Sequence, residues 1–144
     1  MITTNSVQEY PGVFVRIKAI IIDTIIMLLM MVGVTFLFST FELTHENYRI
    51  GAFLTIFVFY DPLMTSLFAG TLGHKMNGLK VKKASDYDRN IIFPLAFLRF
   101  VFKSLLGWIS LLSIGGNQER RAIHDFVAGS VVLYDENMPA VAVD

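Results

Sequence analysis

The sequence predicts an all-α membrane protein with two long transmembrane helices, a third hydrophobic segment that is bent or re-entrant, and a small cytoplasmic β-ribbon. Of the 144 residues, 54% are hydrophobic and 17% are charged, and the mean hydropathy is +0.58. This balance is too apolar for most water-soluble domains of this size. Three apolar runs dominate the chain, and we expect them to form a single domain over residues 1–144.

The first two apolar runs are long enough to cross a bilayer. Residues 17–38 read IKAIIIDTIIMLLMMVGVTFLF, and residues 50–68 form a similar run that contains Asp61. At about 1.5 Å per residue, helices of this length cover a hydrocarbon core of roughly 30 Å. A signal peptide would need a basic start, a shorter apolar stretch and a cleavage site of small residues, which the first run lacks. We therefore expect two retained transmembrane helices.

The third run, residues 91–114, contains two cations. Arg99 and Lys103 lie four residues apart near its middle. A straight span would place both within the bilayer, where each buried cation costs about 2.5–3.5 kcal/mol on insertion scales. A bent or re-entrant segment and an interfacial amphipathic helix compete with a straight span, and we favour the bent segment.

The distribution of Lys and Arg predicts the topology. The loop over residues 70–90 is rich in these cations, whereas residues 39–49 contain few, so we expect the former to be cytoplasmic. The tail over residues 115–144 contains Arg120 and Arg121, which also favour the cytoplasm and an even number of crossings. The sequence thus predicts a multi-pass membrane protein with both termini cytoplasmic.

Two short segments favour β-structure. Residues 78–83 and 129–134 are rich in β-branched residues, begin with glycine and are too short for stable helices. If both lie at the inner face, they form a small antiparallel ribbon, which needs packing to be stable. The last residues, 137–144, are expected to be frayed.

Acidic residues inside the spans are candidate functional groups. Asp23 and Asp61 reach a similar depth on antiparallel helices, and two carboxylates in a low dielectric do not readily both ionise. With Arg99 or Lys103 as the counter-charge, they would form a site that exchanges a proton or a cation. The alternative is a static ion pair that fixes the register of the helices. Both alternatives predict that Asp23→Ala destabilises the protein.

The composition excludes several kinds of site. The chain has no cysteine, which excludes disulfides, Cys-ligated metals and thiol catalysis. Twelve basic and twelve acidic residues give no net charge, so no nucleic-acid partner is expected. The adjacent His124 and Asp125 lack further ligands at metal-binding spacing. No nucleophile arrangement is present, so we expect no enzymatic activity, no catalytic residue, no cofactor and no metal site.

Three ordered motifs resemble the RDD family of small bacterial integral membrane proteins. They are RIKAIIID from Arg16, TLGHK from Thr71 followed by GLKV, and IHD before AGSVV near the end. The resemblance covers roughly residues 12–133. The family is named for one arginine and two aspartates, which correspond here to Arg16, Asp23 and Asp125. The inner-face loop motif corresponds to Thr71, Gly73, Lys75, Gly78 and His124.

Two positions depart mildly from the family pattern. His74 stands where the family usually has lysine, and Ser130 stands where it usually has threonine. The resemblance implies a largely uncharacterised family that is suspected of transport, with some members reported to act in sodium/proton antiport. It also implies that Asp125 returns to the inner face and meets Arg16.

Together with this resemblance, the sequence predicts a multi-pass protein of the bacterial inner membrane that transports ions or protons by cation/proton exchange. Because one chain has too few helices to enclose a pathway, this function requires a homo-oligomer in which Asp23 faces a water-filled cavity. The alternative is a non-transporting accessory subunit or assembly factor of a larger membrane complex. Asp23→Asn separates the two, since only transport needs the titratable charge. A membrane enzyme is the least supported function.

Overall fold

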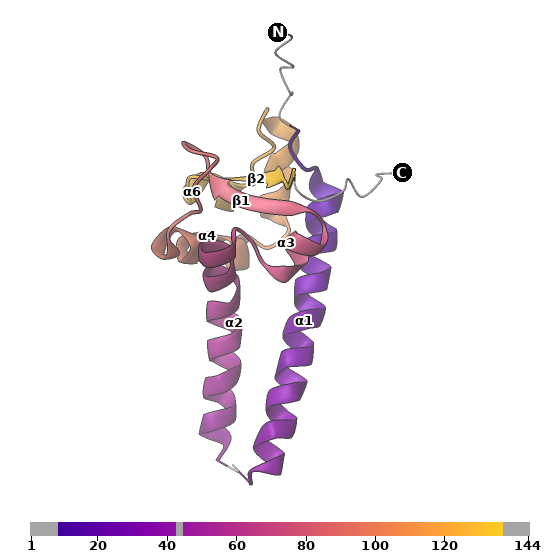
Figure 1. Ribbon diagram of the computed structural model, residues 1–144, viewed down its shortest axis with the longest axis vertical. Coiled ribbons are helices and arrows are strands. Elements are labelled where there is room, and N and C mark those ends of the chain that lie inside the picture. Colours follow the sequence, from indigo (N-terminus) through magenta and orange to yellow (C-terminus); the bar gives the residue numbers. More distant parts are fainter. Residues whose placement is uncertain (1–8, 43–44, 137–144) are drawn as a thin grey trace.

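The computed structural model describes residues 9–42 and 45–136. Two long helices, α1 (Val13–Thr40) and α2 (Glu46–Phe68), run antiparallel, and all other elements gather at the N-terminal end of α1 (Figure 1). These elements are α3 (Leu72–Met76), β1 (Leu79–Lys83), α4 (Phe93–Leu106), α5 (Ile109–Leu112), the 3-10 helix η1 (Ser113–Gly116), α6 (Ile123–Val127) and β2 (Ser130–Tyr134). The expected fraying of residues 137–144 lies outside the described residues.

The helices α1 and α2 are the two predicted spans, and both are long and apolar enough to cross a membrane. Each begins four residues before the predicted run, and α2 continues through Pro62. The buried residues of α1 are Arg16, Ala19 and Asp23, all in its N-terminal half. Side chains farther along α1 are exposed, including Phe36 at 74%. This pattern fits two helices that face lipid along most of their length.

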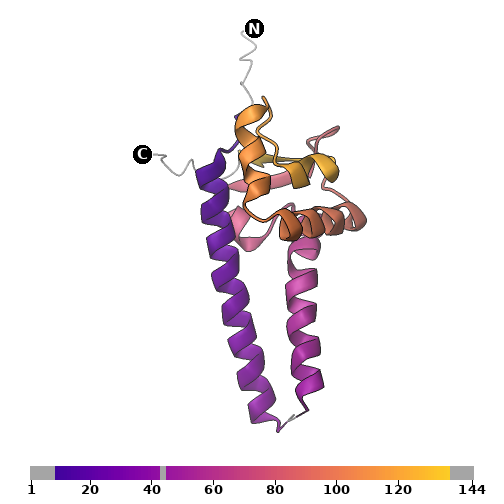
Figure 2. The same ribbon diagram turned by 180° about the vertical axis from the view of Figure 1, so that it is seen from behind.

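The third apolar run is bent, as the sequence predicts. Together, α4 and the α5–η1 segment are long and apolar enough for one span, but they meet at an angle of 101°. Figure 2 shows α4 lying across the axes of the two spans, while α5 turns to run beside α1. The turn is made at Gly107, whose φ of 52° and ψ of −134° favour glycine. The bend points Arg99 into the protein and leaves Leu105 and Trp108 exposed.

The predicted ribbon is also present. Strands β1 and β2 pair antiparallel in a register that places Val81 opposite Val132 and Lys83 opposite Ser130. An isolated two-stranded ribbon would be marginally stable in water. Here Val81 and Val132 are fully buried in a core that also contains Ala19 of α1 and Ala96 of α4. Packing against these two helices therefore supports the ribbon.

Candidate functional site

Charged side chains from four helices form a continuous buried series, which we call the charge chain. It consists of Arg16 of α1, Asp125 of α6, Arg99 and Lys103 of α4, and Asp61 of α2. At one end, Arg16 Nη1 donates to Asp125 Oδ2 at 2.6 Å, and Arg99 Nε donates to Asp125 Oδ1 at 2.9 Å. At the other, Lys103 Nζ donates to Asp61 Oδ2 at 2.6 Å. Arg99 Nη1 links the two halves, 3.7 Å from Asp61 Oδ1.

Asp125 is the most heavily contacted member of the charge chain. Its residue is fully buried in the first turn of α6, where Oδ2 also accepts a hydrogen bond from the backbone N–H of Ala122 at 3.1 Å. Burial alone would raise the pKa of Asp125, but Arg99, His124 and Arg16 around the carboxyl group lower it well below its usual range. Asp125 therefore remains ionised and acts as a fixed anchor for two arginines.

Arg16 connects the start of α1 to the chain segment before α6. Besides its bond to Asp125, its Nη2 donates to the backbone carbonyl of Arg120 at 2.6 Å. The side chain of Arg16 is 4% exposed, so its charge depends on these acceptors. The contact implied by the family resemblance, Arg16 with Asp125, is thus present, and it joins the two ends of the described chain.

Asp61 lies at the crossing of α2 and α4. The residue is 7% exposed, so it is buried at this crossing. Its carboxylate accepts hydrogen bonds from Lys103 and from Thr65 Oγ1, the latter at 3.2 Å. Because Arg99 and Lys103 are four residues apart, they share one face of α4, and both reach this carboxylate. The structure therefore brings together three of the four residues that we considered for an ion or proton site.

Asp23, the fourth of these residues, has other partners. Its carboxylate accepts hydrogen bonds from Thr71 Oγ1 at 2.5 Å, from Gly73 N at 2.8 Å and from Tyr60 Oη at 3.0 Å. It forms no salt bridge with Arg99 or Lys103, which differs from the expectation. The segment after α2 folds back onto α1. The hydroxyl group of Thr71 and the backbone N–H of Gly73 therefore lie within hydrogen-bonding distance of Asp23.

The inner-face loop motif forms this contact with α1. Thr71 precedes α3 as its N-cap and accepts a hydrogen bond from His74 N. A Cβ atom on Gly73 would lie 2.7 Å from Asp23 Cγ and would also collide with the carbonyl oxygen of Ala19. The motif thus requires glycine at position 73 because the backbone of α3 closely approaches α1.

The other members of the loop motif lie around α3. The ammonium group of Lys75 lies over the ring of Phe68, 4.5 Å from its centroid, and Gly78 leads into β1. His74 is buried, and its Nδ1 lies 2.6 Å from Thr71 Oγ1. Burial, with Arg99 and Lys103 nearby, lowers the pKa of His74 well below its usual value, so this histidine is neutral.

His124 joins α5 and α6. Its Nδ1 shares a hydrogen bond of 2.7 Å with Ser110 Oγ, and its backbone N–H donates to the same hydroxyl at 3.1 Å. Burial lowers the pKa of His124 to about 3, so it is neutral at physiological pH. Among the residues that the structure describes, no three His, Cys, Asp or Glu side chains are grouped to hold a metal.

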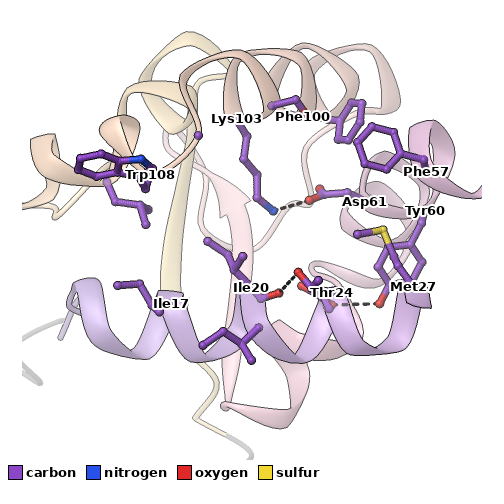
Figure 3. Close-up of a pocket in the computed structure, with 15 residues that line it drawn as sticks. Ile17, Ile20, Thr24, Met27, Phe57, Tyr60, Asp61, Phe100, Lys103 and Trp108 are labelled. Atoms are coloured by element: carbon purple, nitrogen blue, oxygen red, sulfur yellow. Dashed lines mark hydrogen bonds and ion pairs between the residues drawn. The ribbon is translucent and has the colours of Figure 1, made fainter. Parts of the chain in front are cut away.

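A partly open cavity of about 460 Å³ lies between α1, α2 and the α4–α5 bend (Figure 3). Its polar lining consists of Asp23, Thr24, Tyr60, Asp61, Lys103 and Ser104. The rest is mainly apolar, with Phe57, Phe100 and Trp108 among the lining residues. In Figure 3, Lys103 and Asp61 point toward each other across one wall. Asp23 thus lines a cavity, as expected, while the water content of that cavity stays a prediction.

Sequence reasoning missed three partners of the site, Tyr60, Thr65 and Ser110. Tyr60 is next to Asp61 in the chain, yet its hydroxyl donates to Asp23, because adjacent helical residues point in different directions. Thr65 could have been found, since it lies one turn after Asp61. Nothing in the sequence around Ser110 indicates its bond to His124.

Comparison with known proteins supports the family resemblance that the three motifs indicate. Residues 10–129 match the RDD family. The chain is also similar to the uncharacterized membrane protein YteJ of Bacillus subtilis (strain 168), with 26% identity over 142 residues, covering 90% of this chain and 84% of that protein. No solved structure matches the chain.

Proposed function

The chain belongs to the RDD family, and from this premise we propose that it exchanges a cation for a proton across the bacterial inner membrane. The observation that carries the proposal is the Asp61–Lys103 ion pair on the wall of the cavity. The two side chains are 10% and 19% exposed, so they are less enclosed than Asp125. An ionisable pair next to a cavity between spans is a typical ion pathway feature.

The geometry suggests how the exchange would proceed. A cation that enters the cavity and binds Asp61 takes the place of the Lys103 ammonium group. The displaced ammonium would then be an unpaired charge among apolar side chains, which is unfavourable. Binding of one cation at the pair therefore favours the release of one proton from the site to bulk water, which keeps the charge in the cavity constant. Return of a proton to the site restores the Asp61–Lys103 pair and expels the cation.

The proposed transporter is a homo-oligomer. One chain offers two long helices and a bent segment, and the cavity is only partly enclosed by them. Large apolar side chains along α1 and α2, such as Leu29 and Leu54, are exposed. A second copy that packs against these faces would complete the wall of a pathway.

The proposed topology places both termini in the cytoplasm. Pairing of β1 with β2 holds the segments before and after the α4–α5 bend at one end of the molecule. The bond between Arg16 and Asp125 brings the start of α1 to the same end. The α4–α5 segment then stays at this end of the molecule and does not cross the membrane. Because this end contains most of the lysines, the positive-inside rule assigns it to the cytoplasm.

Proton flux in proteoliposomes tests the proposal. Sodium and potassium pulses are read with an internal pH dye for the wild type, Asp61→Asn and Asp23→Asn, with Glu46→Gln as the matched control. Glu46 is an exposed acid at the far end of the helix that contains Asp61. We expect flux in the wild type and the control, and its loss in Asp61→Asn with folding retained in a thermal unfolding assay. Asp23→Asn should also lose flux, because its amide cannot accept all three hydrogen bonds.

Two results would contradict the proposal. The first is the absence of flux from folded, reconstituted wild-type protein. The second is full flux in Asp61→Asn, which would exclude the Asp61–Lys103 pair as the exchange site.

A specific observation favours a second candidate, a non-transporting accessory subunit or assembly factor of a larger membrane complex. The carboxylates of Asp23 and Asp125 accept hydrogen bonds from donors of the protein itself. This arrangement is typical of carboxylates that stabilise the fold. The exposed apolar faces of α1 and α2 would then bind a larger partner. This function predicts co-purification with that partner and intact activity of the complex when Asp61→Asn is introduced.

A further inference from the structure

The cavity is larger and more apolar than a bare alkali cation needs. Its volume of about 460 Å³ lies within the roughly 300–1,000 Å³ of sites for drug-sized ligands. A sodium or potassium site is typically a compact cage of oxygen atoms, whereas the walls here include Ile20, Met27 and Phe100. An apolar part of a ligand would be stabilised by leaving water and packing against these walls.

The charges that line the cavity favour a cation. Asp61 and Lys103 neutralise each other through their 2.6 Å bond. Asp23 is also ionisable, yet its hydrogen-bond donors are two hydroxyl groups and one backbone N–H. Its one salt-bridge contact within the described part of the chain is the buried His74, 3.8 Å away, which is neutral. Asp61 also has Arg99 Nη1 at 3.7 Å behind the cavity wall. Asp23 has no Lys or Arg within salt-bridge distance in the described part of the chain, so the unbalanced carboxylate of the lining is that of Asp23.

Aromatic rings on the cavity wall add to this preference. Phe57 and Phe100 meet edge to face, with centroids 5.8 Å apart, on the side of the cavity nearest Asp61 (Figure 3). Tyr60 and Trp108 also line the cavity. Faces of such rings attract cations, and most strongly where water is excluded.

We propose that the cavity binds an amphipathic organic cation, which has one positive charge on an apolar body. The charge lies near Asp23 and Asp61, and the apolar body fills the space between α1, α2 and α4. This inference deepens the proposed function by adding a second class of substrate, an organic cation, to the alkali cations of the flux assay. It rests on that function only for the transport of the ligand, because binding is measured separately.

Two ions of the same shape and opposite charge test the proposal. The probes are tetraphenylphosphonium and tetraphenylborate, added to the full chain in nanodiscs of zwitterionic lipid. Trp108 is the single tryptophan and lines the cavity, so its fluorescence reports occupancy without a label. After partitioning into empty nanodiscs is subtracted, we expect saturable quenching by the phosphonium and at least about ten-fold weaker binding of the borate.

Variants of the lining charges sharpen the test. Asp61→Asn leaves Lys103 unpaired in the cavity, so it should weaken phosphonium binding by about ten-fold or more and strengthen borate binding. Glu46→Gln is the control and should bind both ions as the wild type does. Lys103→Gln, which keeps both carboxylates, should strengthen phosphonium binding, and it provides a second readout if Asp61→Asn does not fold.

The outcomes are distinguishable from those of the flux assay. Equal binding of the two ions, or tighter binding of the borate to the wild type, would overturn the inference, since an apolar groove that takes any lipid-like molecule would give that result. Alkali-cation flux without phosphonium binding would leave the proposed function standing and refute the substrate class. Phosphonium binding without any flux supports the binding site and removes the transport function.

Discussion

Buried charges at single positions determine how the chain ends are joined. Arg16, Arg99 and Asp125 would each be costly to bury alone, and together they exchange hydrogen bonds inside the protein. The family resemblance implied the contact between Arg16 and Asp125. It did not indicate Arg99 as a second partner, because the contact depends on the bend after α4, which brings that helix under α6.

We predict that Asp125→Asn destabilises the protein by about 3–5 kcal/mol. The asparagine keeps the shape of the side chain, but it leaves the buried guanidinium of Arg16 without a counter-charge and that of Arg99 with Asp61 alone, at 3.7 Å. Unfolding in mild detergent, followed by circular dichroism, measures the loss. A double-mutant cycle with Arg16→Met isolates the coupling between the two side chains, and a coupling energy near zero would contradict the ion pair.

A charge swap between Arg16 and Asp125 would be a poor test of their pairing. Combining Arg16→Asp with Asp125→Arg would restore one pair but place a new arginine against Arg99. The swap should therefore fail to recover stability even though the original contact exists. For this reason the cycle with neutral variants is the better test of the pairing.

At the scale of elements, periodicity and length predicted the helices well, and contacts between elements were harder to predict. The two spans, the bent third segment and the ribbon all follow from apolar runs, embedded cations and β-branched residues. The docking of α3 onto α1 does not, because it depends on the backbone of Gly73 approaching Asp23 across about fifty positions of sequence. Both residues belong to motifs that the sequence analysis identified, but nothing in either motif indicates that the two are in contact.

We predict that Gly73→Ala destabilises the protein by about 1–3 kcal/mol, because the added Cβ pushes α3 away from α1. Gly33→Ala is the matched control within α1, since a Cβ atom there meets nothing within 4 Å. We expect this control to change stability by less than about 1 kcal/mol. Thermal unfolding of both variants and the wild type in the same detergent measures the effect. If Gly73→Ala were as stable as the Gly33→Ala control, this result would contradict the close approach of α3 to α1.

At the scale of the whole molecule, the fold consists of a membrane hairpin closed at one end by a packed cap. The cap contains β1, β2, α3 and α6, and it is held to the spans by the charge chain and by the core around Val81 (Figure 1). Most of the remaining surface of α1 and α2 is apolar and exposed. The sequence predicted the number of spans from composition, but only the pairing of β1 with β2 shows that the segments on either side of the α4–α5 bend lie together.

This arrangement predicts that residues 88 and 118 lie on the same side of the membrane, opposite residue 42. Because the chain has no cysteine, single variants Glu42→Cys, Asp88→Cys and Gln118→Cys give a clean background for a membrane-impermeant maleimide. All three positions are exposed and lie between helices or strands. We expect Glu42→Cys to be labelled on intact spheroplasts and the other two only after permeabilisation. Labelling of Asp88→Cys and Gln118→Cys from opposite sides would show instead that the α4–α5 segment crosses the bilayer, and the cap could then not assemble as a single unit.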